Sequence, residues 1–501
     1  MAPFKNNKNK IYCETYTKED TNTTISTIEK EDSNIPKWWS FLIGNIYDND
    51  NDPYEFTTLR KNVILFIISS INITGPLGSM IYLPCLNSIT TYFNTTDSLV
   101  NASISSFMIA MGIAPLIWAS LSENYGRKRM YIYSNLINIV FSILCANASS
   151  IWMLIIFRGF QSCGANAGQT LGAGVIADMI NINKRGNAYG LFHVGALLSN
   201  IIGPVVGGFL SQYYGWQSIF YFLASIAIVQ FVMVICFLPE TLRKNKPNDD
   251  DIIESDTIHL SKHYRTQKGK FKNFISSFYP VILLLQDPTI LIITLYGTII
   301  TATTYLLNPT ITKTFQSLYG FEELQVGLCF LAFGIGLMLG SVFSGYYSDY
   351  IYEKLQSTTV DKISPESRLK ATIPSFFFIP IGLLVYGWTI EKHLHYIFPL
   401  IGLFTFALGH TGAFTPTSVY LVDSKPGMSA TAVGISIALR CIMASITTYY
   451  SSQILNYLSF SILYSILASI NLFNCLFIPI CMKYGSTWRN RFDQSSKSIR
   501  N

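Results

Sequence analysis

Residues 120–130 read SLSENYGRKRM, and this short stretch decides how the rest of the chain is interpreted. Three consecutive cations, Arg127, Lys128 and Arg129, follow an acid and a glycine, and long apolar runs lie on both sides. The hydrocarbon core of a bilayer excludes such a cluster, because each cation placed there costs at least ~2.5 kcal/mol. We therefore expect the stretch to be a turn between two membrane spans, with the apolar runs as the spans.

The composition extends this interpretation to the whole chain. Half of the 501 residues are apolar and 13% are charged, whereas about 25% of the residues of a soluble domain are charged. A helix needs about 20 mostly apolar residues to cross a bilayer, and the sequence contains twelve such runs. They lie at 62–83, 99–121, 131–149, 151–177, 188–211, 217–238, 287–307, 324–346, 371–390, 396–418, 428–454 and 459–481. The sequence thus predicts an all-α membrane protein with twelve transmembrane helices.

The distribution of charge predicts the orientation of these helices. If both termini are cytosolic, the cations of the short external loops are only Lys313 and Lys392. The short cytosolic loops then hold Arg127, Lys128, Arg129, Lys184, Arg185, Lys354, Lys362, Arg368, Lys370 and Lys425. This asymmetry follows the positive-inside rule. The cations that give the chain its net charge of +6 are therefore expected to lie next to membrane lipid on the cytosolic side. This distribution argues against a nucleic-acid partner.

Polar segments divide the chain into five parts. The N-terminal segment lacks the apolar core of a signal peptide and is expected to be a disordered cytosolic tail. A second polar segment, of mixed charge, separates spans 6 and 7 and is expected to be a cytosolic linker. The parts are a tail at 1–60, a six-helix half at 61–242, a linker at 243–283, a six-helix half at 284–482 and a cytosolic tail at 483–501.

The two halves repeat each other. The stretch ASLSENYGRK at 119–128 matches GYYSDYIYEK at 345–354, with a small residue, an acid and a lysine at equal spacing. These pairs are Ala119 with Gly345, Glu123 with Asp349, and Lys128 with Lys354. The inner ends of spans 4 and 10 likewise carry Asp178 and Asp423. Paired six-helix halves are typical of transporters that rock around a central substrate path.

The loop after span 2 resembles the signature of the major facilitator superfamily, Gly-x-Leu-x-Asp-Arg-x-Gly-Arg-Lys. Leu121, Gly126, Arg127 and Lys128 match it, and Ala119, Glu123 and Asn124 depart from it. Gly126 permits a tight turn. The resemblance implies that Glu123 faces the start of span 11 and that Arg127 pairs with Asp178. It implies a gating latch made by Glu123, Gly126, Arg127 and Lys128, with Gly345 and Asp349 in the second half; simple anchoring of topology is the alternative.

Span 5 resembles the antiporter signature Gly-x8-Gly-x3-Gly-Pro-x2-Gly-Gly of the drug:proton antiporters. The matching positions are Gly190, Ser199, Gly203, Pro204, Gly207 and Gly208, with Ser199 in place of a glycine. Small residues in a membrane helix let a neighbouring helix approach closely. A close-packed helix without an antiport role is the alternative interpretation.

Further stretches resemble the fungal twelve-span drug:proton antiporters, namely GPLGSMIYLP at 75–84, RGFQSCGANAG at 158–168 and LPETLR at 238–243. The subgroup that these stretches resemble contains quinidine-resistance, polyamine and spore-wall dityrosine exporters. The resemblance implies a monomeric, proton-coupled antiporter of the plasma membrane or prospore membrane, which exports a small organic solute such as a dityrosine-type amino-acid derivative. A multidrug or polyamine exporter is the alternative, and a non-transporting membrane sensor is a further one.

Two arginines lie inside apolar spans, and the interiors of the predicted spans contain no Asp or Glu. Arg158, with Gln161 three positions on, lies in span 4, and Arg440 lies in span 11. Arginines without central acids suit a cargo that carries a carboxylate. We therefore expect Arg158, Gln161, Arg440 and Asp178 to line the path of substrate or protons. The alternatives are that Arg158 extends to the membrane surface and that Arg440 clamps backbone carbonyls.

The sequence gives no indication of catalysis or of a cofactor. The nine cysteines are scattered without metal-type or disulfide-type spacing. The spans hold no cluster of His, Asp, Glu and Ser of the kind that an intramembrane enzyme needs, and the chain has no phosphate-binding loop. Of the histidines in the spans, His193 and His410 are candidates either for proton transfer or for packing.

Overall fold

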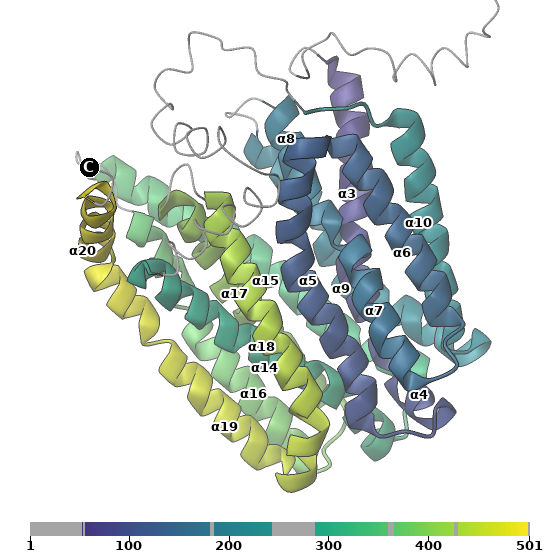
Figure 1. The fold of residues 1–501 in the computed structure, drawn as a ribbon. Coiled ribbons are helices and arrows are strands. Elements are labelled where there is room, and N and C mark those ends of the chain that lie inside the picture. The colour runs from purple at the N-terminus through teal and green to yellow at the C-terminus, as the bar shows by residue number, and fades with distance from the viewer. Residues whose placement is uncertain are drawn as a thin grey trace, which may run out of the picture. The chain divides into compact units, whose positions relative to one another are not determined.

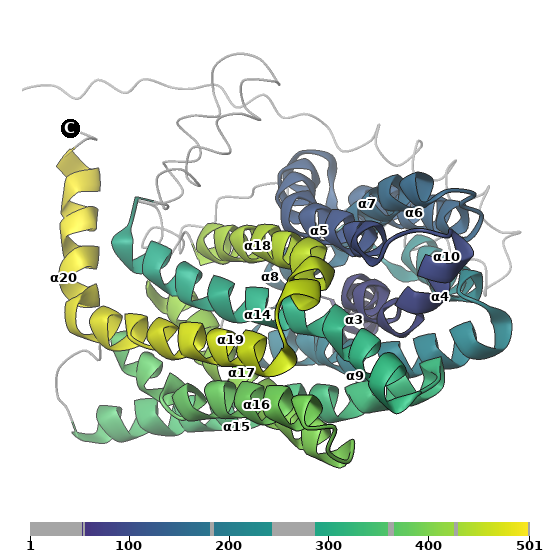
Figure 2. The ribbon, with the colours of Figure 1, turned by 90° about the horizontal axis from the view of Figure 1, so that it is seen from below.

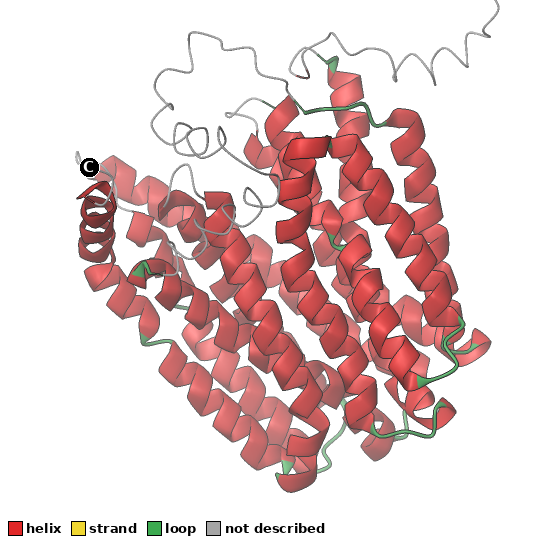
Figure 3. Cartoon of the chain, viewed as in Figure 1, coloured by secondary structure: helices red, strands yellow, loops and turns green. Residues whose placement is uncertain are grey.

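The computed structural model describes residues 53, 56–180, 185–242, 286–358, 365–424 and 429–498. These residues form helices joined by short loops, and the described part of the chain holds no strand (Figure 3). The predicted linker at 243–283 and nearly all of the predicted N-terminal tail lie outside the described residues.

The helices fall into two sets, here called the first half and the second half. The first half consists of α3 (Thr58–Met80), η3 (Leu83–Cys85), α4 (Leu86–Tyr92), α5 (Asp97–Tyr125), α6 (Arg127–Ala146), α7 (Ile151–Ala165), α8 (Ala167–Met179), α9 (Arg185–Tyr214) and α10 (Gln217–Phe237). The second half consists of α14 (Pro288–Tyr319), α15 (Glu323–Thr358), η6 (Pro365–Thr372), α16 (Ser375–Glu391), α17 (Ile397–Ser424), α18 (Ser429–Tyr457), α19 (Phe460–Asn474) and α20 (Phe477–Ser498).

The number of spans agrees with the sequence prediction. Eleven helices of the described residues are long and apolar enough to cross a membrane. The remaining predicted span, at 151–177, is present as two shorter helices, α7 with 15 residues and α8 with 13. Together they supply the length of a twelfth span, and the predicted all-α membrane fold is confirmed.

The same packing pattern occurs in both halves. In the first half α5 packs on α7, α3 on α9, and α6 on α10; in the second half α15 packs on α17, α14 on α18, and α16 on α19. The contacts between the halves repeat in the same way, because α5 packs on α18 and α9 on α15 (Figures 1 and 2). The repeat seen in the sequence is therefore a structural repeat of six spans.

The break between α7 and α8 comes from a polar residue within the span. Asn166 Nδ2 donates to the carbonyl of Ser162 at 3.0 Å and to its Oγ at 2.9 Å. Ser162 Oγ in turn donates to the carbonyl of Phe107 on α5 at 2.6 Å. Asparagine side chains compete with the backbone for hydrogen bonds, and this favours the end of a helix at such a residue. The sequence analysis did not predict this break.

The last predicted span, 459–481, is also divided. α19 ends at Asn474, and α20 begins at Phe477 and continues to Ser498, through most of the segment predicted as a C-terminal tail. Arg489 on α20 forms an ion pair with Glu366 on η6, with 2.7 Å between Nη1 and Oε1. α20 thus packs on η6 at the start of span 9.

Polar side chains within the spans turn away from the lipid. In the apolar helix α10, Val229 and Val232 are exposed at 60% and 52%, whereas Gln230 between them is 4% exposed. Gln230 Nε2 donates to the carbonyl of Ser70 at 2.7 Å, and its Oε1 accepts from Thr74 Oγ1 at 2.9 Å. Both partners lie on α3. A buried amide in lipid needs such partners, and they fix how α10 faces α3.

Candidate functional site

The charged turn after α5 forms an ion pair with the end of span 4. Arg127 Nε lies 3.1 Å from Asp178 Oδ2, and the two side chains are 11% and 18% exposed. The pair joins the first turn of α6 to the last turn of α8. The resemblance implied this contact, and the structure contains it. We call this end of the bundle the Arg127 end; the charge distribution predicts that it is cytosolic.

Gly126 makes the turn possible for two physical reasons. Its φ is +101°, in the region that side chains rarely adopt. A Cβ at this position would also collide with the carboxylate of Glu240. The predicted tight turn is therefore present, and it allows Glu240 to approach the backbone of α6.

Glu240 is a part of this site that the sequence analysis did not assign. Its Oε1 accepts from the backbone N–H of Arg127 at 2.7 Å and from those of Thr241 and Leu242 at 3.1 Å each. The carboxylate thus caps the N-terminus of α6, where unpaired N–H groups and the helix dipole favour a negative charge. Lys128 Nζ donates to the carbonyl of Ile235 at 3.1 Å, so α6 is tied to the end of α10 twice.

The predicted latch also includes a contact between Glu123 and the start of span 11. Glu123 is exposed. Residues 425–428, at the predicted start of span 11, lie outside the described residues, so the contact expected there is not described. The latch remains a prediction in this respect.

A counterpart of this site exists in the second half, and its cation is Arg368. Arg368 Nε lies 2.6 Å from Asp423 Oδ2, and its Nη1 lies 3.3 Å from Asp349 Oδ1. The sequence repeat identifies both acids, but it indicates Arg368 only as a cytosolic charge. Arg368 lies near the start of span 9, as Arg127 lies at the start of span 3. This matching position could have identified Arg368 from the sequence as the cation of the second ion pair. A Cβ at Gly345, the predicted small residue, would meet no atom within 4 Å, so this glycine makes no close helix contact.

The antiporter motif lies where α9 contacts both halves. Ser199 Oγ donates to the carbonyl of Ile73 on α3 at 3.2 Å. A Cβ at Gly207 would collide with the carbonyl of Ile81, after the end of α3, and one at Gly208 would collide with the backbone of Glu323 on α15. These small residues allow close approach, as the sequence predicted.

The other two glycines of the motif differ from each other. At Gly203 a Cβ would lie 3.1 Å from Met80 Cβ, which is also a tight approach. At Gly190 a Cβ would meet no atom within 4 Å, so close packing does not explain this glycine. Pro204 contributes through its backbone, because Gly327 of α15 packs against its carbonyl.

Arg158 is enclosed within the first half. The residue is 0% exposed, so its guanidinium does not extend to the membrane surface. Its Nη1 donates to the carbonyl of Gly78 at 3.0 Å and to Gln161 Oε1 at 3.2 Å. The guanidinium carbon lies 4.4 Å from the ring centres of both Tyr82 and Phe107. Arg158 and Gln161 are thus brought together as expected, but among side chains of their own half.

The hydrogen-bond chain continues from Gln161 into α6. Gln161 Nε2 donates to Ser142 Oγ at 2.9 Å, and Ser142 Oγ donates to Asn138 Oδ1 at 3.3 Å. All three side chains are buried. The α6 residues of this chain lie one turn apart on one face of the helix that begins at Arg127.

Arg440 lies in the second half and has different surroundings. Its Nε donates to the carbonyl of Ser436 at 3.0 Å, and its guanidinium carbon lies 4.4 Å from the ring centre of Phe414. The ring of Phe414 stacks on that of His410, with 6.3 Å between centres. His410 Nδ1 lies 2.8 Å from Thr304 Oγ1. The backbone clamp considered from the sequence is present, but through one nitrogen only. His193, the other candidate histidine, is exposed.

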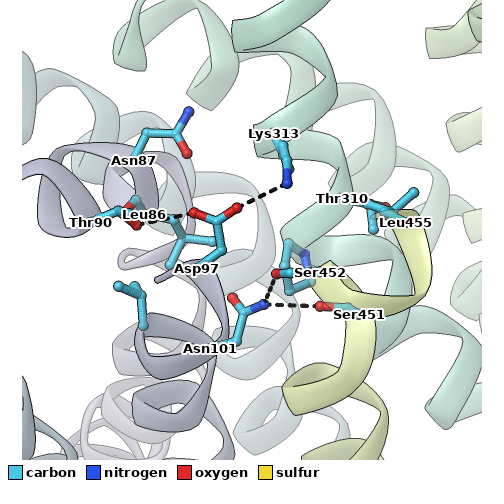
Figure 4. A pocket seen from close by; sticks show the side chains of 12 residues that line it. Leu86, Asn87, Thr90, Asp97, Asn101, Thr310, Lys313, Ser451, Ser452 and Leu455 are labelled. Carbon is cyan, nitrogen blue, oxygen red and sulfur yellow. Dashed lines mark hydrogen bonds and ion pairs between the residues drawn. The ribbon is translucent and has the colours of Figure 1, made fainter. Parts of the chain in front are cut away.

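At the opposite end of α5 the two halves are bonded to each other (Figure 4). Lys313 Nζ on α14 lies 2.9 Å from Asp97 Oδ2 at the start of α5. Asn101 Nδ2 donates to Ser451 Oγ at 3.0 Å and to Ser452 Oγ at 2.6 Å, both on α18. These groups line a small pocket between the halves. We call this end the Lys313 end; the charge distribution predicts that it is external.

Further hydrogen bonds join the two halves. Gln212 and Glu322 bond to each other, as do Ser88 and Glu323. Thr312 Oγ1 donates to the carbonyl of Leu83 at 2.9 Å. Apart from Lys313, which was noted as an external charge, the sequence analysis assigned none of these contacts. Each joins residues that are far apart in the chain, and no motif marks them.

The described residues contain no group of three or more His, Cys, Asp or Glu side chains that is placed to hold a metal ion. Two six-helix halves, with charged and hydrogen-bonding side chains enclosed between apolar spans, define the class of membrane transporters.

The particular family follows from comparison with known proteins. Residues 66–448 match the Major Facilitator Superfamily, and the chain belongs to this family. It is therefore a transporter and not an enzyme. Its fold is similar to that of a D-xylose–proton symporter, with a TM-score of 0.62 at 14% identity over 83% of this chain and 97% of that chain.

The chain is also similar to several fungal transporters. It is 31% identical to efflux pump radE of Floropilus chiversii, over 92% of this chain and 86% of that protein. It is 29% identical to citrate exporter 1 of Aspergillus niger, over 89% and 90% respectively. It is 26% identical to MFS antiporter QDR3 of Candida albicans, over 88% and 80%. Efflux pumps and antiporters among the relatives agree with the resemblance to fungal drug:proton antiporters.

Proposed function

We propose that this chain is a monomeric, proton-coupled antiporter that exports a small organic solute with a carboxylate, such as a dityrosine-type amino-acid derivative. It acts by alternating access in the plasma membrane or the prospore membrane, with both termini in the cytosol. One observation carries the proposal: Arg440 lies in a span and has no carboxylate partner among the described residues. An anionic cargo supplies the missing charge.

The comparisons support export rather than uptake. The relatives include proteins named as an efflux pump, a citrate exporter and an antiporter. Citrate is an organic acid, and an organic-acid cargo agrees with arginines that lack acidic partners. A multidrug or polyamine exporter is the second candidate, and it is favoured by the similarity to the antiporter QDR3.

In the proposed cycle the proton acts at the Arg127 end. Protonation of Asp178 removes the charge that holds Arg127, and the contact between α6 and α8 weakens. The backbone of Arg127 is also bonded to Glu240, three residues after the end of α10, so a change at Asp178 can reach the end of the sixth span as well. The latch at Glu123, which holds the outward-facing state, then releases, and the halves rock to the inward-facing state, in which the bonds at the Lys313 end close the external side. Loss of the proton to the cytosol and binding of the cargo return the halves to the outward-facing state, so the proton moves inward as the cargo moves outward.

Uptake into inside-out vesicles under an imposed pH gradient tests this function. The cargo panel is dityrosine, citrate, a cationic drug and a polyamine. We expect gradient-driven uptake of dityrosine or citrate and none of the cations. Uptake of only the drug or the polyamine would instead support the second candidate, and no gradient-driven uptake of any compound would support a non-transporting sensor.

A further inference from the structure

The two buried arginines differ in how completely the protein surrounds them. Arg158 Nε and Nη2 are buried and have no hydrogen-bond partner, so no solute reaches them in this structure. Arg440 is 8% exposed, and neither of its Nη atoms is among the buried atoms without a partner. Arg440 Nε is bonded to Ser436, and neither terminal nitrogen has a hydrogen bond to the described residues, so both remain free to bind a ligand.

Three helices of the second half supply the surroundings of the guanidinium. α18 supplies Arg440, α17 supplies His410 and Phe414, and α14 supplies Thr304. His410 and Phe414 are half-buried and not enclosed in the core. The bond between Thr304 and His410 fixes the imidazole, and the stacking of His410 on Phe414 extends the aromatic surface beside the guanidinium. The arrangement is held by packing and hydrogen bonds and needs no ligand to form.

The chemistry of the arrangement selects an anion with an apolar body. A guanidinium with two free terminal nitrogens binds a carboxylate through two parallel hydrogen bonds. The described residues place no acid within ion-pair distance of Arg440, so an incoming carboxylate meets no competitor. The rings of Phe414 and His410 offer an aromatic or aliphatic group a surface next to that charge.

We infer that Arg440, Phe414 and His410 form the subsite that binds the carboxylate and the adjoining apolar part of the cargo. Arg158 has a different role: it positions α3 and α7 through Gly78 and Gln161 and does not touch cargo. This assignment rests on the proposed function, because it concerns the cargo of the same transport path. It goes further by separating two arginines that the sequence treats alike.

Binding to the purified full-length protein tests the subsite without a proton gradient. The probes are 3-(4-hydroxyphenyl)propionate and its amide, which have the same shape and differ in charge. Calorimetry at one fixed pH gives both affinities. We expect the carboxylate to bind the wild type about tenfold more tightly, as a charged hydrogen-bonded pair provides. Equal binding of the two probes would overturn the assignment.

Variants then show which residue gives the preference for the carboxylate over the amide. In Arg440→Gln the carboxylate and the amide should bind equally, with the affinity for the amide unchanged. In Phe414→Leu both affinities should fall about threefold to tenfold while their ratio is kept, because the aromatic surface is lost. Arg129→Gln, which removes an exposed arginine, is the control and should keep the wild-type ratio. A wild-type ratio in Arg440→Gln would overturn the assignment.

Arg440→Lys covers the case in which Arg440→Gln does not fold. It keeps the charge and loses the planar pair of donors, so the ratio should fall severalfold; an unchanged ratio contradicts the subsite. Failure here is distinct from failure of the proposed function. Gradient-driven uptake with an unchanged ratio in Arg440 variants rejects the subsite alone, whereas a lost ratio without any gradient-driven uptake rejects the antiport function alone.

Discussion

Lys313 Nζ lies 2.9 Å from Asp97 Oδ2, and this ion pair connects the two halves of the transporter. Both side chains are about one-third exposed, at 36% and 35%, so water and salt screen their attraction. Such a pair alone contributes about 0–1 kcal/mol. It acts together with the bonds from Asn101 to Ser451 and Ser452, and all of these contacts must break when the halves separate at this end.

Removing this charge pair should loosen the Lys313 end. In Asp97→Asn we expect a cysteine placed at Thr310, which lines the pocket, to react about threefold to fivefold faster with an impermeant maleimide. The measurement is the labelling rate in intact cells. The double exchange Asp97→Lys with Lys313→Asp should restore the slow rate. Lys392→Gln, which removes the other cation predicted to be external, should leave labelling unchanged, and an equal effect of both variants would contradict a specific role for the pair.

A second prediction concerns the backbone of the charged turn. Gly126→Ala places a Cβ at φ +101° and against Glu240, so the free energy of unfolding should fall by about 1–3 kcal/mol. The measurement is the thermal unfolding of the purified protein. Gly345→Ala is the matched control, because a Cβ there meets no atom within 4 Å. The control should be neutral or slightly stabilising, since alanine favours helix.

The antiporter motif gives a similar comparison within one helix. Gly207→Ala should lower stability and transport, because its Cβ collides with the carbonyl of Ile81 and forces α9 away from α3. Overpacking of this kind costs about 1–3 kcal/mol. Gly190→Ala should not lower stability, because its Cβ enters open space. A loss of transport in Gly190→Ala with normal stability would show that this glycine serves the transport cycle and not the packing.

The spans were predictable because each is determined by local composition. The twelve apolar runs and the repeat needed no knowledge of distant contacts. The pairing of Arg127 with Asp178 was implied by the resemblance to the superfamily and not by a local pattern. The pair of Asp97 and Lys313 joins residues 216 positions apart, and nothing near either residue indicates the other. The same applies to Glu240, whose partner Arg127 is 113 positions away. Such contacts depend on how whole helices pack, and one sequence does not specify that packing by any local pattern.

The break at Asn166 and the two environments of the arginines illustrate the same limit. Asn166 ends α7 because its amide finds Ser162, whose hydroxyl is held by α5. Arg158 and Arg440 have similar apolar neighbours in sequence, yet Arg158 is fully enclosed between Tyr82 and Phe107, whereas Arg440 contacts Phe414 and stays 8% exposed. The difference lies in which helices surround each arginine.

Substitutions of Glu240 and Glu123 should have different effects, the first on stability and the second on transport. Glu240→Ala removes the acceptor for the backbone N–H of Arg127, and loss of a helix cap costs about 0.5–2 kcal/mol. Thermal unfolding of the purified protein should show this loss. Glu123 is exposed, so Glu123→Ala should keep stability and, if the predicted latch is correct, reduce gradient-driven transport. A stable Glu123→Ala with normal transport would favour simple anchoring of topology for the charged turn.

The proton site gives the last prediction, on Asp178. Asp178→Asn imitates the protonated acid and leaves Arg127 without its charge partner, so stability should fall by about 1–3 kcal/mol, between the values for exposed and buried pairs. Export should persist but lose its dependence on the pH gradient. Adding Arg127→Gln should recover part of the stability, because the unpaired cation is gone, without restoring coupling.

The second half supplies the control for this prediction. Asp423 pairs with Arg368 at the corresponding place in the second half, although Arg368 also contacts Asp349. If Asp178 carries the proton, Asp423→Asn should lower stability by less than Asp178→Asn does, because Arg368 keeps an acidic partner, and should keep the response of vesicle uptake to the pH gradient. Loss of that response in Asp423→Asn, with the response intact in Asp178→Asn, would move the proton site to the second half. Loss in both would mean that the two ion pairs serve the rocking motion and that the proton acts elsewhere.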